Sequence, residues 1–263
     1  MRNICLITLL LLYLNQGVAA EIPAVVRDCL ERNLPESTSV QAIELRARDR
    51  TGYEQTLQSN VYLKRYEDGH ARVMMHFNEP ADVRGARFLI IQQAPDNEMY
   101  IYMPGLFVVR KITSRNISSS VLGTDFSYED FERLYGILTD VKAKRFADDV
   151  LDGRPVYVVN SYPESSSDYV KIAAYIDIET CITLKIDLYE SGYQLRKSLT
   201  VDPAKIRSAG EINVPGEILM RDLRDKTETL LVVQNISADL PLSDTLFNPE
   251  QLKTADVPPV PAD

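Results

Sequence analysis

Side chains that could perform acid–base or metal chemistry are few in this chain and are spaced unfavourably. The 263 residues include two histidines, His70 and His76. On one strand face these would lie six residues, or about 20 Å, apart, which is too far to bind one metal ion. The adjacent carboxylates Asp148 and Asp149 fit a charged turn better than an acid and base pair. The sequence has no GxSxG, HExxH or CxxC motif and no phosphate-binding glycine loop. We therefore expect a binding protein and not an enzyme, with no catalytic residue, metal or cofactor.

The first twenty residues have the pattern of an export signal. Arg2 precedes an apolar stretch from Ile7 to Leu14, and the small residues at 18–20 precede Glu21. The apolar stretch is too short to span a bilayer as a helix. The sequence thus predicts a cleaved signal peptide at residues 1–20 and a soluble exported chain from Glu21. Because the net charge is −9, we expect no nucleic-acid partner.

Two cysteines, Cys29 and Cys181, lie outside the predicted signal peptide. In an oxidising compartment they favour a single disulfide. Closing so long a loop would stabilise the fold by about 4–5 kcal/mol in the chain-entropy model. The alternative is a pair of buried thiols that pack as small apolar side chains.

A short helix is predicted in the middle of the chain, between residues 122 and 136. Ser127 and Asp130 have the spacing of a capping box, and Phe126 and Phe131 that of a hydrophobic staple. Gly136 supplies a left-handed stop. So short a helix is marginal without tertiary packing, so we expect it to lie as a plug on a concave sheet. The apolar face comprises Tyr128, Phe131, Leu134 and Tyr135.

Most of the remaining chain is predicted to form strands. Leu57, Val61 and Leu63 alternate with polar residues and with Tyr62, which indicates one dry face. Residues 86–91 and 99–112 carry apolar side chains on both faces and should be covered on two sides. Residues 23–33 are predicted to form a helix that buries Val25, Val26, Cys29 and Leu30 on one face. The short spacing of the strands favours one antiparallel sheet curled toward a barrel. The proline-rich residues 254–263 are expected to be a disordered tail.

Several motifs resemble the LolA-like family of outer-membrane lipoprotein-sorting proteins. They are YIYMPGLFVVRKI at 100–112, GTDFSYED at 123–130, RNLP at 32–35, Arg84-Gly85 and MRDL at 220–223. The resemblance covers nearly the whole mature chain. It implies a mainly β (α+β) domain over residues 21–253, a single unclosed antiparallel β-barrel whose concave apolar face is covered by a few helices. It also implies a periplasmic protein that carries or senses lipids or lipoproteins, although a shared fold does not fix the cargo.

The resemblance implies an apolar hollow with a movable cover. The residues expected to line it are Phe88, Ile90, Tyr100, Tyr102, Leu106 and Val108 from the strands, and Phe126, Tyr128 and Phe131 from the helix. Burying an acyl chain there would contribute about 0.8 kcal/mol per methylene. The alternative is that these side chains simply form the protein core, as aromatic stripes more often do.

Charged residues beside the hollow are expected to control it. Asp125 and Arg110 are a candidate ion pair that latches the helix shut. Arg84, Arg87, Lys111 and Arg115 could bind a lipid phosphate or could form a solvated rim. We expect a monomeric carrier of lipid or lipoprotein acyl chains, with an inner-membrane exporter as a possible partner. The alternative is a non-catalytic interaction module that serves as adaptor for an envelope exporter or assembly machine.

Overall fold

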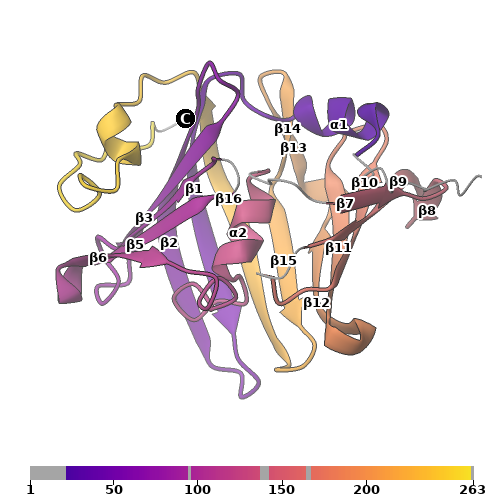
Figure 1. Ribbon diagram of the computed structural model, residues 1–263, viewed down its shortest axis with the longest axis horizontal. Helices are drawn as coiled ribbons and strands as arrows, with labels where there is room; N and C mark the ends of the chain where they lie inside the picture. Colours follow the sequence, from indigo (N-terminus) through magenta and orange to yellow (C-terminus); the bar gives the residue numbers. More distant parts are fainter. Residues whose placement is uncertain (1–21, 94–95, 137–141, 164–166, 262–263) are drawn as a thin grey trace, which may run out of the picture.

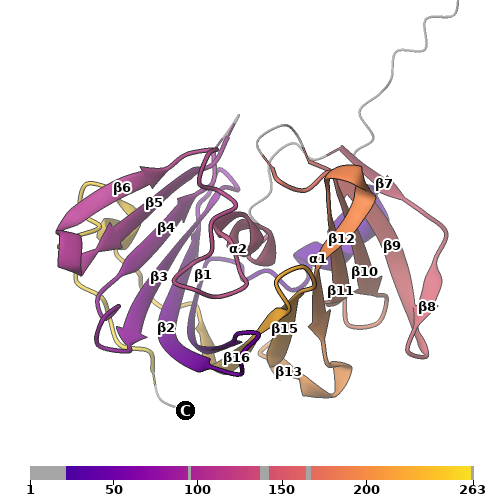
Figure 2. The same ribbon diagram turned by 90° about the horizontal axis from the view of Figure 1, so that it is seen from below.

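The computed structural model describes residues 22–93, 96–136, 142–163 and 167–261. Fourteen of its strands form one antiparallel sheet, ordered β6-β5-β4-β3-β2-β1-β16-β15-β12-β11-β10-β9-β7, with β8 also paired to β9. The two end strands of this order, β6 and β7, are not paired with each other. The sheet is therefore an open half-barrel, as the resemblance predicts, and Figure 2 shows its two walls with helix α2 between them.

The strands in chain order have the following bounds. They are β1 (Thr38–Arg48), β2 (Glu54–Arg65), β3 (Ala71–Glu79), β4 (Arg87–Ile91), β5 (Glu98–Met103), β6 (Val108–Ile112), β7 (Lys142–Arg145), β8 (Asp149–Leu151), β9 (Arg154–Tyr162), β10 (Lys171–Asp177), β11 (Thr183–Glu190), β12 (Gln194–Val201), β13 (Ile206–Ala209), β14 (Ile212–Pro215), β15 (Glu217–Asp222) and β16 (Thr227–Ala238). Strands β13 and β14 form a separate hairpin.

Two α-helices, α1 (Ala24–Glu31) and α2 (Tyr128–Leu134), accompany the described sheet (Figure 1). Four short 3-10 helices are η1 (Pro104–Leu106), η2 (Ser191–Tyr193), η3 (Pro203–Lys205) and η4 (Asp244–Phe247). None of the helices in the described ranges has both the length and the apolar character needed to cross a membrane. The predicted signal peptide at residues 1–20 lies outside the described residues.

Helix α1 is joined to the sheet by the disulfide that the sequence favours. Cys29 and Cys181 are bonded, with their Cα atoms 5.2 Å apart. Both cysteines are buried in a small cluster with Val26 and with side chains of β7, β9 and β10. The prediction that Val25 shares this buried face is wrong, because its side chain is 45% exposed. Helix α1 packs against one wall of the sheet, and only the face that carries Val26 and Cys29 is buried there.

The main core lies on the concave face of the sheet. Leu57, Val61 and Leu63 are buried there, as their alternation predicts, together with apolar residues from both walls and from α2. Strand β4 is covered on both faces, which confirms the prediction from its unbroken apolar run.

The convex face of strands β1 to β5 is also covered, by the chain that follows β16 (Figure 1). Tyr62, expected on the wet side of β2, is fully buried there. Its hydroxyl donates a hydrogen bond to the carbonyl of Pro258. Residues 254–261, assigned to a disordered tail from their prolines, lie against this face. Ala255 is buried and Val257 and Val260 pack beside it, so apolar side chains between the prolines hold the extended chain in place.

Candidate functional site

Helix α2 is built from the local signals that the sequence contains. The N–H of Asp130 donates to Ser127 Oγ at 3.1 Å, and the N–H of Ser127 donates to Asp130 Oδ2 at 2.8 Å. This is the reciprocal capping box. Gly136 follows the helix with φ +67°, the conformation that ends helices at glycine. The helix is thus fixed at both ends by its own sequence.

The aromatic side chains of this region pack together inside the half-barrel. Phe126 and Phe131 stack with ring centroids 5.1 Å apart, which confirms the predicted staple. Phe88 from β4 lies 4.9 Å from Tyr128 and 6.5 Å from Phe131. All four are buried, and Ile90 is buried in the same cluster. The structure therefore brings together five of the predicted cavity residues, and the rings of α2 occupy the concave space.

Tyr100 and Tyr102 lie on the opposite face of the sheet from this aromatic cluster. In the antiparallel register, Phe88 is paired with Ile101 and Ile90 with Met99. Paired residues share a face and neighbouring residues alternate, so the two tyrosines contribute to the convex cluster. The prediction that Tyr100 and Tyr102 line the hollow is therefore wrong. With apolar residues on both faces of β5, the sequence did not show which face was concave.

Leu106 and Val108 lie at the turn between β5 and β6 and do not reach the aromatic cluster. Leu106 belongs to η1 and is 57% exposed, while Val108 begins the edge strand and is 43% exposed. The sequence predicts a turn at Pro104-Gly105, which is confirmed, but it counts Leu106 and Val108 among the residues that line the hollow. The turn instead places these two side chains at the tip of a hairpin, outside the core.

The proposed ion pair between Arg110 and Asp125 does not form in the described structure. The carboxylate of Asp125 accepts hydrogen bonds from the hydroxyls of Thr227 and Thr229 on β16. The N–H of Asp125 also donates to Thr229 Oγ1 at 2.8 Å. Burial raises the pKa of Asp125, because these hydroxyls replace water only in part. Asp125 does fasten the loop before α2, but to β16 and not to Arg110.

A second fastening, absent from the sequence predictions, holds the helix itself. Lys197 Nζ on β12 lies 2.8 Å from Asp130 Oδ2 and also donates to the carbonyl of Asp125 at 2.8 Å. Tyr169 donates its hydroxyl proton to Asp130 Oδ1 at 3.0 Å. Burial and the neighbouring charge of Asp130 raise the pKa of Tyr169, so this hydroxyl keeps its proton. We call Lys197, Asp130 and Tyr169 the α2 latch.

The acidic side of α2 is also buried, whereas its sequence pattern suggests an ordinary polar face. The carboxylate of Glu129 is 2% exposed and pairs with Arg133 at 2.7 Å. It also accepts a hydrogen bond from Ser167. Burial raises the pKa of Glu132, whose carboxylate accepts a hydrogen bond from Asn97. Polar groups of neighbouring segments therefore surround the helix.

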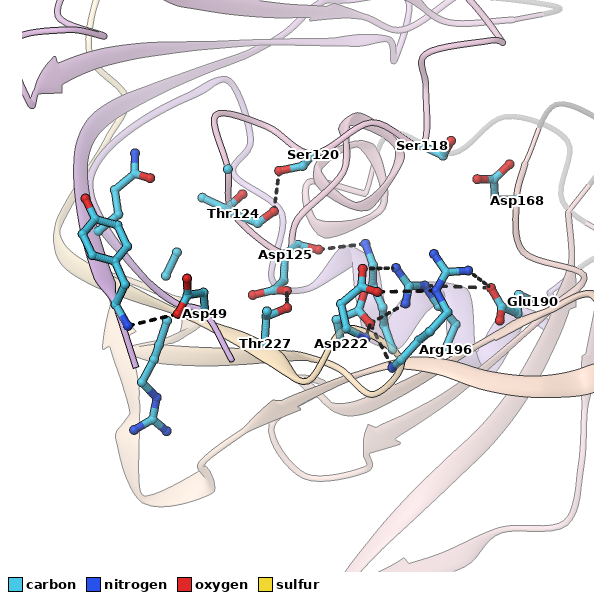
Figure 3. A pocket seen from close by; sticks show the side chains of 18 of the residues that line it. Asp49, Ser118, Ser120, Thr124, Asp125, Asp168, Glu190, Arg196, Asp222 and Thr227 are labelled. Carbon is cyan, nitrogen blue, oxygen red and sulfur yellow. Dashed lines mark hydrogen bonds and ion pairs between the residues drawn. The ribbon is translucent and has the colours of Figure 1, made fainter. Parts of the chain in front are cut away.

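A polar pocket of about 420 Å³ lies beside the N-terminal end of α2 (Figure 3). Its four basic side chains are bound by carboxylates within the protein: Arg48 by Glu228, Arg196 by Asp222 and Asp225, Lys197 by Asp130, and Arg224 by Glu190. Asp125 and Thr227 face each other across a hydrogen bond in its wall. So charged a wall is unsuited to an acyl chain. The apolar surface that could receive one lies under α2. Among the described residues, no group of three or more His, Cys, Asp or Glu side chains could hold a metal ion.

The sequence alone could not reveal the latch. Asp130 was identified as a helix cap, but Lys197 lies 67 residues away along the chain and Tyr169 lies 39 away. Lysine at this point of β12 reads as an ordinary solvent-facing strand residue. Only the pairing of β12 with β15 and β11 brings it under the start of α2.

Comparison with solved structures shows which proteins share this fold. A domain named for outer membrane lipoprotein sorting, from Vibrio parahaemolyticus, has a TM-score of 0.78 and 22% identity, covering 87% of this chain and 97% of that chain. A DUF1329 family protein from Desulfovibrio piger has a TM-score of 0.78 and 21% identity, covering 85% and 94%. A LolA superfamily protein from Nitrosomonas europaea has a TM-score of 0.67 and 17% identity, covering 86% and 96%. At these identities the likeness establishes the fold.

Sequence comparison gives one further result. None of the curated proteins matches this chain. A family model described as "Uncharacterized protein" matches residues 69–254, which is more than half of the chain. The chain therefore belongs to the family of that model, and its fold is that of the LolA-like outer-membrane lipoprotein-sorting proteins.

Proposed function

We propose that this protein is a periplasmic carrier of the acyl part of a lipid or lipoprotein, and that α2 is a plug which the cargo displaces. The observation that carries the proposal is the position of α2. Its aromatic side chains fill the concave face of an open half-barrel, between walls that are not closed over it (Figure 2). An apolar surface covered by one short helix is what a reversible acyl site requires.

Displacement of α2 is energetically reasonable. The helix has seven residues, and so short a helix has little stability without its tertiary contacts. Displacing α2 separates the buried ion pair of Asp130 and Lys197, and it costs up to about 3–5 kcal/mol where Lys197 stays buried without its carboxylate. An acyl chain that buries about ten methylenes would contribute about 8 kcal/mol. The cargo can therefore offset the loss of the latch and part of the lost aromatic packing.

The close packing of α2 on the concave face also supports a second function. If α2 never leaves, the apolar concave surface stays covered, and the outer surfaces of the half-barrel would serve as a non-catalytic module that binds envelope proteins. The two functions differ in a measurable property, since only the carrier binds acyl chains with an affinity that depends on the latch.

The test uses two buried tyrosines that fasten opposite faces of the sheet. Tyr169→Phe removes the hydroxyl bond to Asp130 in the latch, and Tyr62→Phe removes a hydroxyl bond to Pro258 on the convex face. A hydrogen bond to a charged group contributes about 1.5–3 kcal/mol. We expect Tyr169→Phe to populate the displaced state more and to bind a fluorescent fatty acid about tenfold more tightly. Tyr62→Phe should bind it as the parent does.

The parent protein should also release lipid on solvent extraction and show bound lipid in native mass spectra. Absence of lipid, together with no binding of the fatty acid by the parent or by Tyr169→Phe, would contradict the carrier and leave the interaction module. Equal changes in the two variants would mean that affinity follows general stability and not the release of α2.

A further inference from the structure

The hairpin turn between β5 and β6 presents a small apolar tip to solvent. Leu106, Phe107 and Val108 are consecutive and are 57%, 71% and 43% exposed. The turn lies at the outer end of the wall formed by β1 to β6, where it projects beyond the neighbouring strands in Figures 1 and 2. Exposed apolar residues are common singly, but three in a row at a projecting tip are not needed for folding.

The backbone at this tip is held in a conformation that favours glycine. Phe107 has φ +53°, and its N–H donates to the carbonyl of Pro104 at 3.1 Å. A bulky residue in the left-handed region is strained, and such strain is usually kept where the side chain has a use outside the fold. Phe107 gains little packing from the protein in return, since most of its ring faces water.

Positive charge surrounds the tip although the chain as a whole is acidic. Lys253 Nζ lies 5.5 Å from the ring centroid of Phe107. Arg110, two residues beyond Val108, is exposed, and neither Arg110 nor Lys253 has a carboxylate partner within the described residues. Lys111 follows and pairs with Glu98. The apolar tip therefore has a cationic rim in a protein of net charge −9.

A second turn shows that exposure and strain alone do not make such a tip. Tyr193, between β11 and β12, has φ +58° and is 64% exposed. It is flanked by Gly192 and Gln194, and the acid Glu190 lies at the base of its turn. Tyr193 itself carries a polar hydroxyl. This turn is thus a comparison with a similar positive φ but without three consecutive apolar side chains, and the nearby Arg196 and Arg224 pair with Glu190.

We propose that the β5–β6 tip inserts into the interface of an anionic lipid bilayer. An apolar wedge with flanking Lys and Arg is typical of groups that enter the headgroup region, where acyl chains accept the apolar part and anionic phosphates the charges. A convex tip of three side chains offers far less surface than the roughly 800 Å² per partner of a stable protein interface. Lipid, in contrast, adapts to a protruding shape.

The tip lies at the start of β6, the edge strand of the half-barrel, and at the side of the molecule away from α2 (Figures 1 and 2). Membrane contact there leaves α2 and the concave face uncovered by the bilayer. The membrane contact does not depend on the proposed carrier function.

The experiment compares glycine substitutions at the two turns. Phe107→Gly and Tyr193→Gly both suit a positive φ, so neither should lower the melting temperature. The mature chain is sedimented with vesicles of phosphatidylethanolamine and phosphatidylglycerol, and with vesicles of phosphatidylcholine alone. We expect the parent and Tyr193→Gly to bind the anionic vesicles equally, and Phe107→Gly to bind about tenfold more weakly. Arg110→Gln and Lys253→Gln should each weaken binding about fivefold, and only on the anionic vesicles.

Three results would overturn the membrane contact. If the parent does not sediment with the anionic vesicles, or if Phe107→Gly and Tyr193→Gly bind alike, the membrane contact is overturned. Capture of a protein that depends on Phe107, without binding to vesicles, would overturn it in favour of a protein partner. Fatty-acid binding by Phe107→Gly reports on the carrier function separately, because Phe107 lies outside the aromatic cluster under α2.

Discussion

The two faces of the N-terminal wall of the sheet are both covered, but by covers of different construction. The concave cover is residues 121–136, the loop before α2 and the helix itself. The convex cover is residues 239–261, which include η4. Each cover is fastened by one lysine that binds a carboxylate and a backbone carbonyl. Lys197 binds Asp130 and the carbonyl of Asp125 on the concave side, and Lys64 binds Asp244 and the carbonyl of Leu242 on the convex side.

The difference lies in what surrounds the fastening. The side chains of Lys197 and Asp130 are 10% and 2% exposed, while those of Lys64 and Asp244 are 23% and 70% exposed. A buried ion pair is costly to leave half-broken, whereas an exposed pair can exchange with water. The concave cover is therefore held by bonds that are made or lost together, which suits a plug with two positions. The convex cover relies more on apolar packing of side chains such as Phe247 and Leu252.

The largest expected effect comes from removing the two lysines in turn. Lys197→Met leaves Asp130 buried without its cation and should lower the free energy of unfolding by about 3–5 kcal/mol. Lys64→Met removes a pair of the same length, 2.8 Å, but should cost only about 0–1 kcal/mol. Urea denaturation of both variants measures the difference. Equal losses would mean that the two covers are fastened alike and that the latch has no special role.

The parts of this architecture that local sequence determines could be predicted. The capping box, the staple and the stop of α2 involve residues within ten positions of one another. Alternation indicated the concave side of β2, because Leu57, Val61 and Leu63 lie an even number of positions apart along the strand. The disulfide followed from two cysteines in a chain with an export signal. Each of these depends on neighbours in the chain or on a count of one residue type.

The parts that depend on strand register and on distant segments could not be predicted. Tyr100 and Tyr102 were assigned to the hollow because β5 is apolar on both faces, and a shift of one residue reverses the face. The predicted ion pair between Arg110 and Asp125 is wrong for a related reason, because Asp125 binds Thr229 on the distant strand β16. The convex cover was missed because prolines at 258, 259 and 261 suggested disorder, although valines beside them pack on the sheet.

A smaller contrast is expected from two buried threonines, one under each cover. Thr229 donates to the Asp125 carboxylate at 2.7 Å and accepts from its N–H. Thr38 donates to the carbonyl of Leu240 at 2.8 Å. Thr229→Val should cost about 2–3 kcal/mol, because it removes a bond to a charged group and leaves the part-buried N–H of Asp125 without its acceptor. Thr38→Val should cost about 1 kcal/mol.

The same denaturation measurements test the threonine pair, with hydrogen exchange to locate the change. Exchange should rise in residues 121–136 for Thr229→Val and in residues 239–261 for Thr38→Val. A uniform rise over the whole sheet in either variant would show that the covers do not open separately. The comparison between two independent covers would then fail.

The smallest expected effect is a loss of stability at acid pH that acts through the convex side. His76 lies on β3, opposite Arg87, whose guanidinium donates to the carbonyl of Leu252 in the convex cover. Burial, followed by the charge of Arg87, lowers the pKa of His76 from 6.5 to about 4. Below pH 6.5 the unfolded chain therefore takes up a proton on this histidine that the folded chain does not. The free energy of unfolding should fall as the pH is lowered from 6.5 to about 4.

Because His76 is only half-buried, the loss should be about 1–2 kcal/mol after solvent screening is allowed for. His76→Gln should remove this part of the pH dependence in urea denaturation between about pH 7 and about pH 4. In the parent protein at acid pH, hydrogen exchange should rise first in residues 239–261, while residues 121–136 stay protected. If His76→Gln leaves the pH dependence unchanged, or if α2 exchanges first, acid does not act through the convex cover. The two faces would then differ in the strength of their fastenings but not in their response to pH.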